Sequence, residues 1–350
     1  MRKKLIILFN VIMVIFINIT DGIGQIPTTD KNWNTTPVLN QSFFSNSLPD
    51  PTIWNYDVYG ANTLLHCGAN PICELQLYRY QNLFPSSDTT KGLTMKELNN
   101  PMSGKIFGYS PPDSTVCDGG KNYRNFNYIS GSITTKIPYS YGYYQADIWV
   151  PKGKGLWPAF WLHAYGQEID ILEIPGAYSE ETLKYQANVY GLTPSPEDSK
   201  DINTGDLSTG FHNFAIEWTP ERVVFYFDKK PVRSVSGTGG SHVPNIPMKV
   251  MFNLAVSPWV IPLPPNLTNN DLKIKNFKIY QLKTAFITPA PTIDNFNTYD
   301  YKVYLNYNIA NKALLSGYNV TLRAATYIRI DSSFEVPEDA EFNAIITKSW

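Results

Sequence analysis

The chain is built from short segments in which apolar and polar residues alternate, separated by clusters of Gly, Pro, Asn and Asp. Clear examples are residues 130–151, 212–232, 248–259 and 272–282. Alternate residues of a β-strand point to opposite faces, so a period of two predicts antiparallel strands with one buried face. The 14% aromatic residues, 26 Pro and 22 Gly also favour strands joined by turns. The sequence therefore predicts an all-β chain.

The charge of the chain argues against one class of partner. The formal net charge is −1, only 17% of the residues are charged, and no basic run occurs beyond the extreme N-terminus. Nucleic acid is therefore not expected as a partner. The 23 Tyr and 8 Trp suit a sugar-binding surface and a sandwich core equally well, so composition does not choose between them.

The N-terminus has the pattern of an export signal. A basic start, MRKK, precedes the apolar run Leu5–Ile19, and small and polar residues follow. The apolar run is shorter than the roughly 20 residues of a membrane-spanning helix. We predict a signal peptide over residues 1–24, cleaved near Gly24 or Gln25, and the alternative is a retained anchor. The mature protein is expected to be secreted, periplasmic or at the cell surface, without stable membrane insertion.

The rest of the chain divides into four predicted parts. A polar, extended leader covers residues 25–49, and the series of strand-like segments covers residues 50–283. Residues 284–295 contain two prolines and read as a linker. Residues 296–350 return to strand-like alternation but are too few for a large core, so we expect a small β module there.

The cysteines leave their pairing open. An oxidising compartment would favour a disulfide, but Cys67, Cys73 and Cys117 are odd in number. One thiol is therefore unpaired or shared between chains. His66 beside Cys67 does not make a metal site, and no metal ligands can be assigned.

Three carboxylates stand among aliphatic residues in the segment GQEIDILEIPG, residues 166–176. Alternation places Glu168 and Asp170 on one face of a strand and sends Glu173 to the other. A single bulge between Asp170 and Glu173 would restore Glu173 to the face of the other two. The spacing therefore predicts a bulged strand with three acids on one side and aliphatic side chains on the other.

Such a face has a known chemical use. Retaining glycosidases place two carboxyl groups about 5–5.5 Å apart, one as nucleophile and one as acid/base. An intervening Asp can orient the nucleophile and share its proton. The alternatives are an acidic strand that faces water and a set of calcium ligands.

The surrounding residues narrow this choice. Residues 141–176 resemble glycoside hydrolase family 16, whose laminarinase-like members carry E-x-D-x-x-E just after a W-P-A-F-W strand. Upstream, WNYDVYG and CELQLY are similar to further segments of that family, as are residues 212–232 and 248–259 downstream, in the same order. The resemblance spans residues 54–282. It implies a curved β-jelly-roll sandwich of the concanavalin A-like kind, with a cleft on its concave face.

The resemblance also implies roles for the three acids. Glu168 corresponds to the nucleophile, Glu173 to the general acid/base and Asp170 to an assisting acid, in the bulged, laminarinase-like branch of the family. No cofactor is required for such a reaction. A structural calcium ion is compatible with the resemblance, although its ligands are unknown.

Candidate sugar-binding residues follow from position in the resembling segments. They are Trp157, Trp259, Glu74, Gln76 and Asn188. A packing role is the alternative for each aromatic residue, and a structural role for Glu74 and Gln76. Trp161 and His163 are expected to pack rather than to bind sugar.

Several positions depart from the family pattern. Many members carry a His where this chain has Asn188. Ser257 and Pro258 replace a Gly pair, and Gln145 and Asp147 replace an acid and an Arg. The catalytic acids are retained, but these departures leave the substrate open.

The sequence thus predicts a monomeric, secreted, endo-acting retaining β-glycanase whose partner is a polysaccharide, most simply β-1,3-glucan. The first alternative is a β-galactanase acting on agar, porphyran or carrageenan. The second is a non-catalytic glucan-binding protein, which would be expected to lose Glu168 or Glu173. The small C-terminal segment resembles modules on secreted bacterial proteins, and a role in carbohydrate binding or as a spacer stays open.

Overall fold

The computed structural model describes most of the predicted large domain and the strands that follow it. The described residues are 33, 36–56, 74–105, 123–164, 166–176, 181–191, 199–219, 222–236, 242–257 and 271–281, with residue 338 and six strands between 284 and 346. The predicted signal peptide, the three cysteines, Pro258 and Trp259 lie outside the described residues. No helix in the described part is long and apolar enough to cross a membrane.

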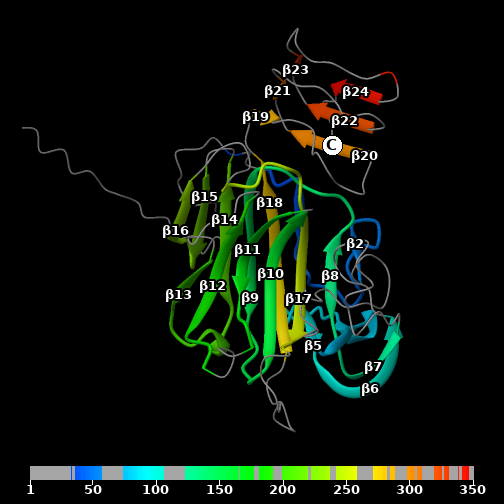
Figure 1. The fold of residues 1–350 in the computed structure, drawn as a ribbon, viewed down its shortest axis with the longest axis vertical. Helices are drawn as coiled ribbons and strands as arrows, with labels where there is room; N and C mark the ends of the chain where they lie inside the picture. Colours follow the sequence, from blue (N-terminus) through cyan, green and yellow to red (C-terminus); the bar gives the residue numbers. More distant parts are fainter. Residues whose placement is uncertain are drawn as a thin grey trace, which may run out of the picture.

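Two curved sheets form the body of the protein (Figure 1). The first has the order β16 (Lys230–Ser236), β15 (Arg222–Phe227), β14 (His212–Trp218), β9 (Gly142–Trp149), β18 (Asp271–Tyr280), β5 (Leu93–Lys96) and β4 (Leu83–Phe84), with β1 (Leu39–Gln41) paired to β18. All of these pairs are antiparallel.

The second sheet carries the acidic segment. Its order is β13 (Ser199–Asn203), β12 (Lys184–Tyr190), β11 (Gln167–Glu173), β10 (Leu156–Ala164), β17 (Lys249–Val256), β8 (Ser132–Thr135) and β2 (Trp54–Asn55). These pairs are antiparallel as well. The two sheets pack face to face, which is the predicted jelly-roll sandwich.

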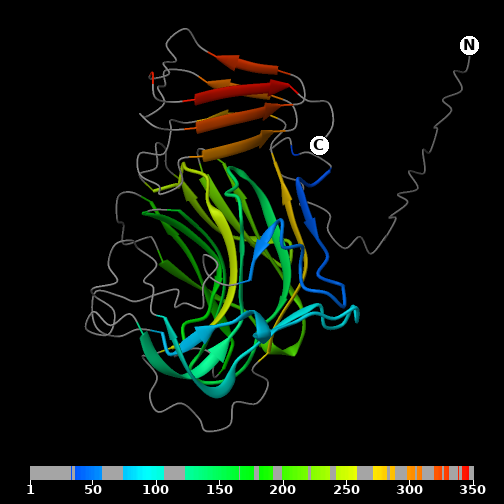
Figure 2. The same ribbon diagram turned by 90° about the vertical axis from the view of Figure 1, so that its right-hand side faces the viewer.

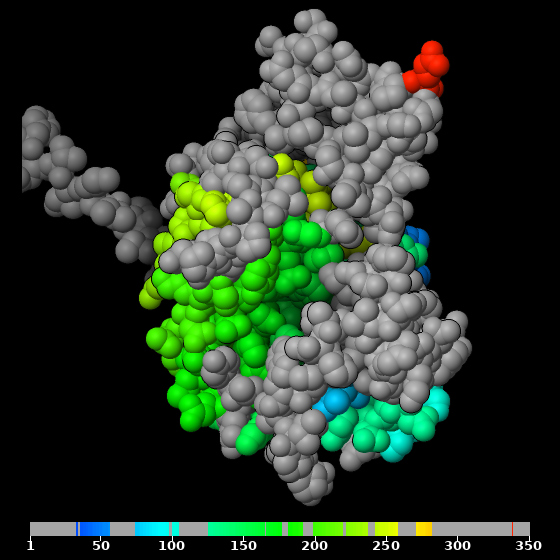
Figure 3. All heavy atoms as spheres, in the orientation of Figure 1, coloured from blue at the N-terminus to red at the C-terminus, as the bar shows by residue number. Residues whose placement is uncertain are grey.

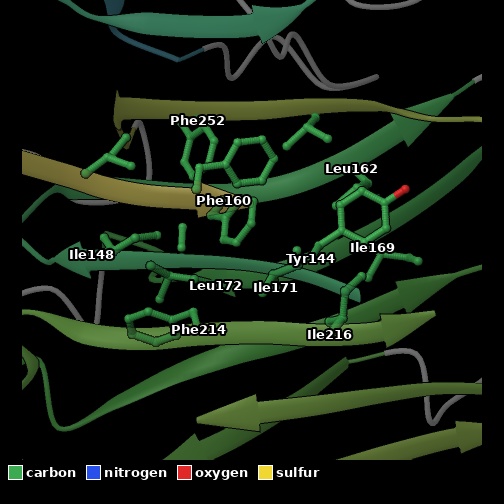
Figure 4. Packing of buried hydrophobic residues seen from close by; sticks show 14 of the residues in the cluster. Tyr144, Ile148, Phe160, Leu162, Ile169, Ile171, Leu172, Phe214, Ile216 and Phe252 are labelled. Carbon is green, nitrogen blue, oxygen red and sulfur yellow. The ribbon is translucent and has the colours of Figure 1, made fainter. Parts of the chain in front are cut away.

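The main core lies between the sheets, where the apolar residues of the alternating pattern meet. Phe160 of β10 stacks on Phe252 of the neighbouring β17, with ring centroids 4.4 Å apart and planes 9° apart. Phe214 of β14 and Ile148 of β9 approach from the first sheet (Figure 4). Each of these four side chains is almost completely buried. The period of two in the sequence therefore corresponds to one face of each sheet turned inward.

A third, smaller sheet flanks the second one. It consists of β3 (Gln76–Tyr78), β7 (Tyr123–Ser130) and β6 (Leu98–Lys105), with β3 parallel to β7. The described helical turns are two short 3₁₀ segments, Tyr80–Asn82 and Leu207–Thr209. The backbone of β17 connects to this sheet, because the N–H of Leu75 donates to the carbonyl of Val256 over 3.0 Å.

The predicted leader, residues 25–49, is partly built into the sandwich. Strand β1 pairs with β18, and Leu39 and Phe43 are buried in the main core. The ring of Phe43 lies 5.6 Å from that of Trp54. Trp33 packs edge-on against Tyr143, on the outer side of the first sheet. The segment is polar on average, yet three of its apolar side chains are buried against the domain.

The strands after residue 283 form two parallel sheets. One contains β19 (Thr284–Ile287), β21 (Asn306–Ile309) and β23 (Tyr327–Ile330), and the other contains β20 (Thr298–Val303), β22 (Asn319–Ala324) and β24 (Glu341–Ile346). The chain alternates between the two sheets. Both views place these strands beyond one end of the sandwich (Figures 1 and 2).

This arrangement is a β-solenoid with a repeat of 21 or 22 residues. Thr284 pairs with Asn306, and Asn306 pairs with Tyr327. The sequence predicts a small β module here but not its repeat. It also predicts a linker at residues 284–295, whereas β19 occupies residues 284–287 of that range.

The packing of the leader gives a direct prediction for stability. Replacing Phe43 with Ala should lower the free energy of unfolding by about 3–5 kcal/mol, because a buried aromatic ring is removed from the core. Val38→Ala in the same segment is the control, since Val38 is 36% exposed. Urea unfolding of both variants measures the difference. Equal midpoints for the two variants would contradict the assignment of the leader to the sandwich.

Candidate active site

The predicted bulge is present in β11. Asp170 lies opposite Asn188 on β12 and Glu173 lies opposite Gln186, so three steps on β11 match two on β12. On the other side of β11, Leu172 and Asp170 face two consecutive residues of β10. One extra residue, Ile171, is therefore accommodated between Asp170 and Leu172.

The bulge sorts the side chains of β11 by chemical type. Ile169, Ile171 and Leu172 all belong to the main core, although Ile171 and Leu172 are adjacent (Figure 4). A regular strand would send one of these two neighbours to the opposite face. With the extra residue accommodated, Glu173 returns to the face of Glu168 and Asp170.

The register identifies the residues that share this face. Opposite residues of antiparallel strands point the same way. The neighbours of the three acids are therefore Trp157, Ala159, Trp161 and His163 on β10, Lys249, Met251, Asn253 and Ala255 on β17, and Lys184, Gln186, Asn188 and Tyr190 on β12. The surface is hollowed near its middle, over the green residues of β10 to β12 (Figure 3). We call this surface the acidic face.

Hydrogen bonds hold the carboxyl groups in place. The indole Nε1 of Trp157 donates to Oε1 of Glu173 over 2.9 Å. The Nδ2 of Asn188 donates to Oδ2 of Asp170 over 2.9 Å and to Oε2 of Glu173 over 2.7 Å. Asp170 and Glu168 share a further side-chain hydrogen bond, which favours charge on Glu168 and a proton on Asp170. Each acid is thus fixed by at least one neighbour.

Burial raises the pKa of all three carboxyl groups. The pKa of Glu168 rises to about 8, through burial first and the charge of Glu173 second, against the opposing effect of the bond from Asp170. The pKa of Asp170 rises well above its ordinary value through burial and the charges of both glutamates. The pKa of Glu173 rises because burial outweighs the bonds from Trp157 and Asn188.

These shifts depend on one another. A proton on Glu173 removes the negative charge that raises the pKa of Glu168. The O–H of a protonated Asp170 then donates a hydrogen bond to Glu168 and stabilises the negative charge of Glu168. Protons on Asp170 and Glu173 with a charge on Glu168 therefore form a self-consistent state. In that state the acidic face offers one nucleophilic carboxylate and one carboxylic acid.

Trp157 forms a hydrogen bond with one of the acids, whereas Trp161 forms its hydrogen bond with the neighbouring strand β17. Trp161 donates from Nε1 to Oδ1 of Asn253 over 2.7 Å, and Asn253 donates to the hydroxyl of Tyr78 over 3.0 Å. Both tryptophans pack on a cluster that includes Tyr78. His163 lies beside Trp161, and burial together with the charge of Lys249 holds its pKa well below the ordinary value.

The structure places Glu74 and Gln76 in a buried contact between the small sheet and β17. Gln76 accepts the N–H of Val256 through Oε1 over 2.6 Å and donates through Nε2 to Glu74 over 2.8 Å. Both side chains are almost completely buried. The amide of Gln76 is thus occupied by protein groups at both ends.

Two of the departures from the family pattern lie away from the acids. Gln145 and Asp147 stand on β9, in the other sheet, where Asp147 accepts hydrogen bonds from Asn213 and Asn276. A third departure, Ser257, directly follows β17, and its N–H donates to the carbonyl of Gly155 over 2.8 Å.

Tyr190 also lies on the acidic face, although the candidate residues predicted from the sequence do not include it. It lies opposite Glu168 and is 37% exposed. Burial, and after it the charges of the three acids, raise the pKa of its hydroxyl, while a bond with Ser199 opposes the rise. Alternation from Asn188 would have placed Tyr190 on the same face, so the signal was present in the sequence.

Among the described residues, no group of three or more His, Cys, Asp or Glu side chains is arranged to hold a metal ion. The structural calcium ion therefore stays a prediction without ligands.

The family model for glycosyl hydrolases family 16 matches residues 78–262. An endo-1,3-1,4-beta-glycanase, ExsH, of Rhizobium meliloti is 29% identical over 206 residues, which cover 57% of this chain and 42% of the relative. A beta-glucanase of Rhodothermus marinus is 26% identical over 215 residues, which cover 57% of this chain and 65% of the relative. The chain thus spans less than two thirds of either relative.

The fold has counterparts among solved structures. An endo-beta-1,3-glucanase from Pyrococcus furiosus matches with a TM-score of 0.55 at 21% identity, covering 73% of this chain and 97% of that one. The likeness at this identity concerns the fold. The family model matches more than half of the chain, including β10, β11, β12 and the three acids. The chain therefore belongs to glycosyl hydrolases family 16.

Proposed function

We propose that the protein is an endo-acting, retaining β-glycanase that hydrolyses β-1,3-glucan by double displacement. The observation that carries this proposal is the bulged strand β11, which gathers Glu168, Asp170 and Glu173 on one face. Family membership supports a glycosidase, and the retained glutamates argue against a purely binding role.

The first step forms a glycosyl-enzyme. The ionised carboxylate of Glu168 attacks the anomeric carbon, and the bond to the leaving oxygen breaks. The proton of Glu173 passes to that oxygen, so the leaving chain departs as an alcohol. Asp170 donates its hydrogen bond to Glu168 until the attack and so keeps the attacking oxygen oriented.

The second step reverses these roles. Glu173, now ionised, removes a proton from a water molecule, and the water oxygen attacks the anomeric carbon. The ester bond to Glu168 breaks and returns the carboxylate, while Glu173 regains its proton. The bonds from Trp157 and Asn188 support Glu173 while it carries charge.

The choice of β-1,3-glucan rests on the relatives and on the acidic face. The relatives carry the names endo-1,3-1,4-beta-glycanase and beta-glucanase. A neutral glucan would contact Trp157 and Tyr190, on the two strands that flank β11. Lys184, a basic residue of the same face, forms an ion pair with Asp201 at 2.6 Å, which is compatible with a neutral substrate.

We also propose that the protein acts outside the cytoplasm. The order of basic, apolar and polar residues at the N-terminus supports export. Polysaccharides are too large to cross a membrane unaided, so a hydrolase acting on them is most useful outside it.

Product analysis tests the proposed reaction. Laminarin should yield oligosaccharides whose first-formed anomer is β, seen by proton NMR. Glu168→Gln should lower the rate by about a thousandfold or more, because the nucleophile is lost. Mixed-linkage glucan, agarose, porphyran and carrageenan are incubated in parallel.

Glu181→Gln is the matched control, since Glu181 is an exposed glutamate. It should cut at the rate of the unmodified protein. A folded protein that binds one polysaccharide without cutting any would favour the binding-protein reading. An α anomer as first product would contradict double displacement.

The pH dependence tests the role of Glu173. Its pKa lies above the ordinary value, and the Trp157 N–H opposes that rise by stabilising the ionised form. Trp157→Phe removes the donor and keeps an aromatic ring, so the pKa of Glu173 should rise further. The alkaline limb of kcat/KM, which reports loss of the acid proton, should move up by about one pH unit. An unchanged alkaline limb would contradict this assignment.

A further inference from the structure

The outer face of the first sheet, across the core from the acidic face, carries a row of aromatic rings. On β4, β5, β18 and β9, alternate residues of this region belong to the main core, so the residues between them point outward. The register aligns Phe84, Thr94, Lys273 and Trp149 on these four adjacent strands. Phe211, directly before β14, continues the row, since its ring centroid lies 5.7 Å from that of Trp149.

A lysine ammonium group lies over each of the three rings in this row. The electron-rich face of an aromatic ring attracts such a cation. Contact with the ring also restricts a side chain that otherwise has many rotamers, so less entropy is lost when an anion binds to it. The distances from Nζ to the ring centroid are 5.1 Å for Lys96 and Phe84, 4.2 Å for Lys273 and Trp149, and 4.0 Å for Lys275 and Phe211. We call these six side chains the cationic row.

The cationic row is held in place at its centre and open to solvent at one end. The indole Nε1 of Trp157's counterpart on this face, Trp149, donates to the carbonyl of Ser208 over 2.7 Å, which fixes the ring beneath Lys273. At the β4 end, Phe84 is 38% exposed. A ligand from solution can therefore reach ordered lysines without a rearrangement of the sheet.

Lysines outnumber aspartates on the outer side of β5, β18 and β9. Lys278 follows Lys275 on β18. Asp271 forms an ion pair with Lys96 at 3.7 Å, and Asp147 accepts hydrogen bonds from two asparagine side chains. The whole chain has a formal net charge of −1, so the positive charge is concentrated here rather than spread over the protein. This excess is complementary to a negatively charged partner.

The shape of the cationic row favours an extended partner. The row crosses the strands, and neighbouring strands of a sheet lie about 4.8 Å apart, so the distance from Phe84 on β4 to Phe211 beside β14 is about 19 Å. One small anion would contact only a part of this length. A linear polymer with repeated negative charges can contact all three lysines at once.

We propose that the cationic row is a second binding surface, for an acidic polysaccharide whose carboxylate groups pair with the three lysines. The choice of a polysaccharide rests on the proposed function, since a hydrolase of such polymers meets them where it acts. A sugar ring can also place its apolar face on the exposed ring of Phe84. The core separates the two surfaces, so an acidic chain can be bound on one sheet while a neutral glucan is cut on the other.

Calorimetric titration with alginate, a polymer of uronic acids, tests the proposal at low ionic strength. The unmodified protein should bind, and added salt should weaken the binding. A triple variant, Lys96→Gln with Lys273→Gln and Lys275→Gln, should raise Kd about tenfold or more, because three charge-assisted contacts are lost. The absence of alginate binding by the unmodified protein would overturn the proposal.

A second triple variant is the matched control. It carries Lys136→Gln, Lys200→Gln and Lys230→Gln, which remove three exposed lysines from other parts of the surface. Its Kd for alginate should change by less than about twofold, since only the general charge of the protein is altered. An equal loss of affinity in the two triple variants would overturn the proposal, because the binding would then follow total charge.

Two further titrations test the rings and the kind of polymer. Phe84→Leu keeps every lysine but removes the ring beneath Lys96, so it should raise Kd about threefold. An unchanged Kd would contradict the role given to the rings. Poly-L-glutamate carries carboxylates without sugar rings and should bind more weakly than alginate. Equal affinity for the two polymers would overturn the assignment to a polysaccharide.

The Glu168→Gln variant separates this proposal from the proposed function. It should bind alginate like the unmodified protein, because Glu168 lies on the other sheet. A changed affinity would place alginate on the acidic face and overturn the proposal. If the unmodified protein cut no polysaccharide, the proposed function would fail, yet the titrations would still decide whether the cationic row binds.

Discussion

The burial of three carboxyl groups side by side is the constraint on which the rest of this structure depends. Each group would by itself favour water, and their charges repel one another. The protein offsets this by sharing protons among the acids and by donating hydrogen bonds from Trp157 and Asn188. The same features that make the cluster unfavourable for stability raise the carboxyl pKa values into a range useful for acid catalysis.

The sandwich explains how such a cluster is held. Strand β11 has aliphatic side chains on its core face throughout, and the bulge at Ile171 keeps them there while turning Glu173 to the acids. The neighbouring β10 and β17 are locked together by the stacked rings of Phe160 and Phe252. Gln76 then fastens the backbone of β17 to the small sheet. Rigid packing on one face thus positions the chemistry on the other.

Much of the fold and of the candidate site follows from local patterns in the sequence. Alternation along β10 to β12 and the odd spacing of Glu173 predicted the strand, the bulge and the shared face. The features that the sequence did not predict depend on contacts between segments far apart in the chain. The burial of Phe43 in the core and the occupied amide of Gln76 depend on partners far along the chain, which alternation does not reveal. The repeat of the C-terminal β-solenoid was missed because its successive 21- or 22-residue repeats share few identical residues. Only the parallel pairing of their strands reveals it.

The most direct test of the central claim is the free energy of unfolding of the unmodified protein and of Glu168→Gln at several pH values. Burial and mutual repulsion raise the pKa values of the three acids in the fold, so the folded cluster binds protons more tightly than the unfolded chain does. Stability should therefore fall as the pH rises between about 4.5 and 8, by up to about 1.4 kcal/mol per unit for one proton. The variant has one acid fewer in the cluster, so it should lose less stability and its advantage should grow with pH. A difference that stays constant across this window would contradict the account.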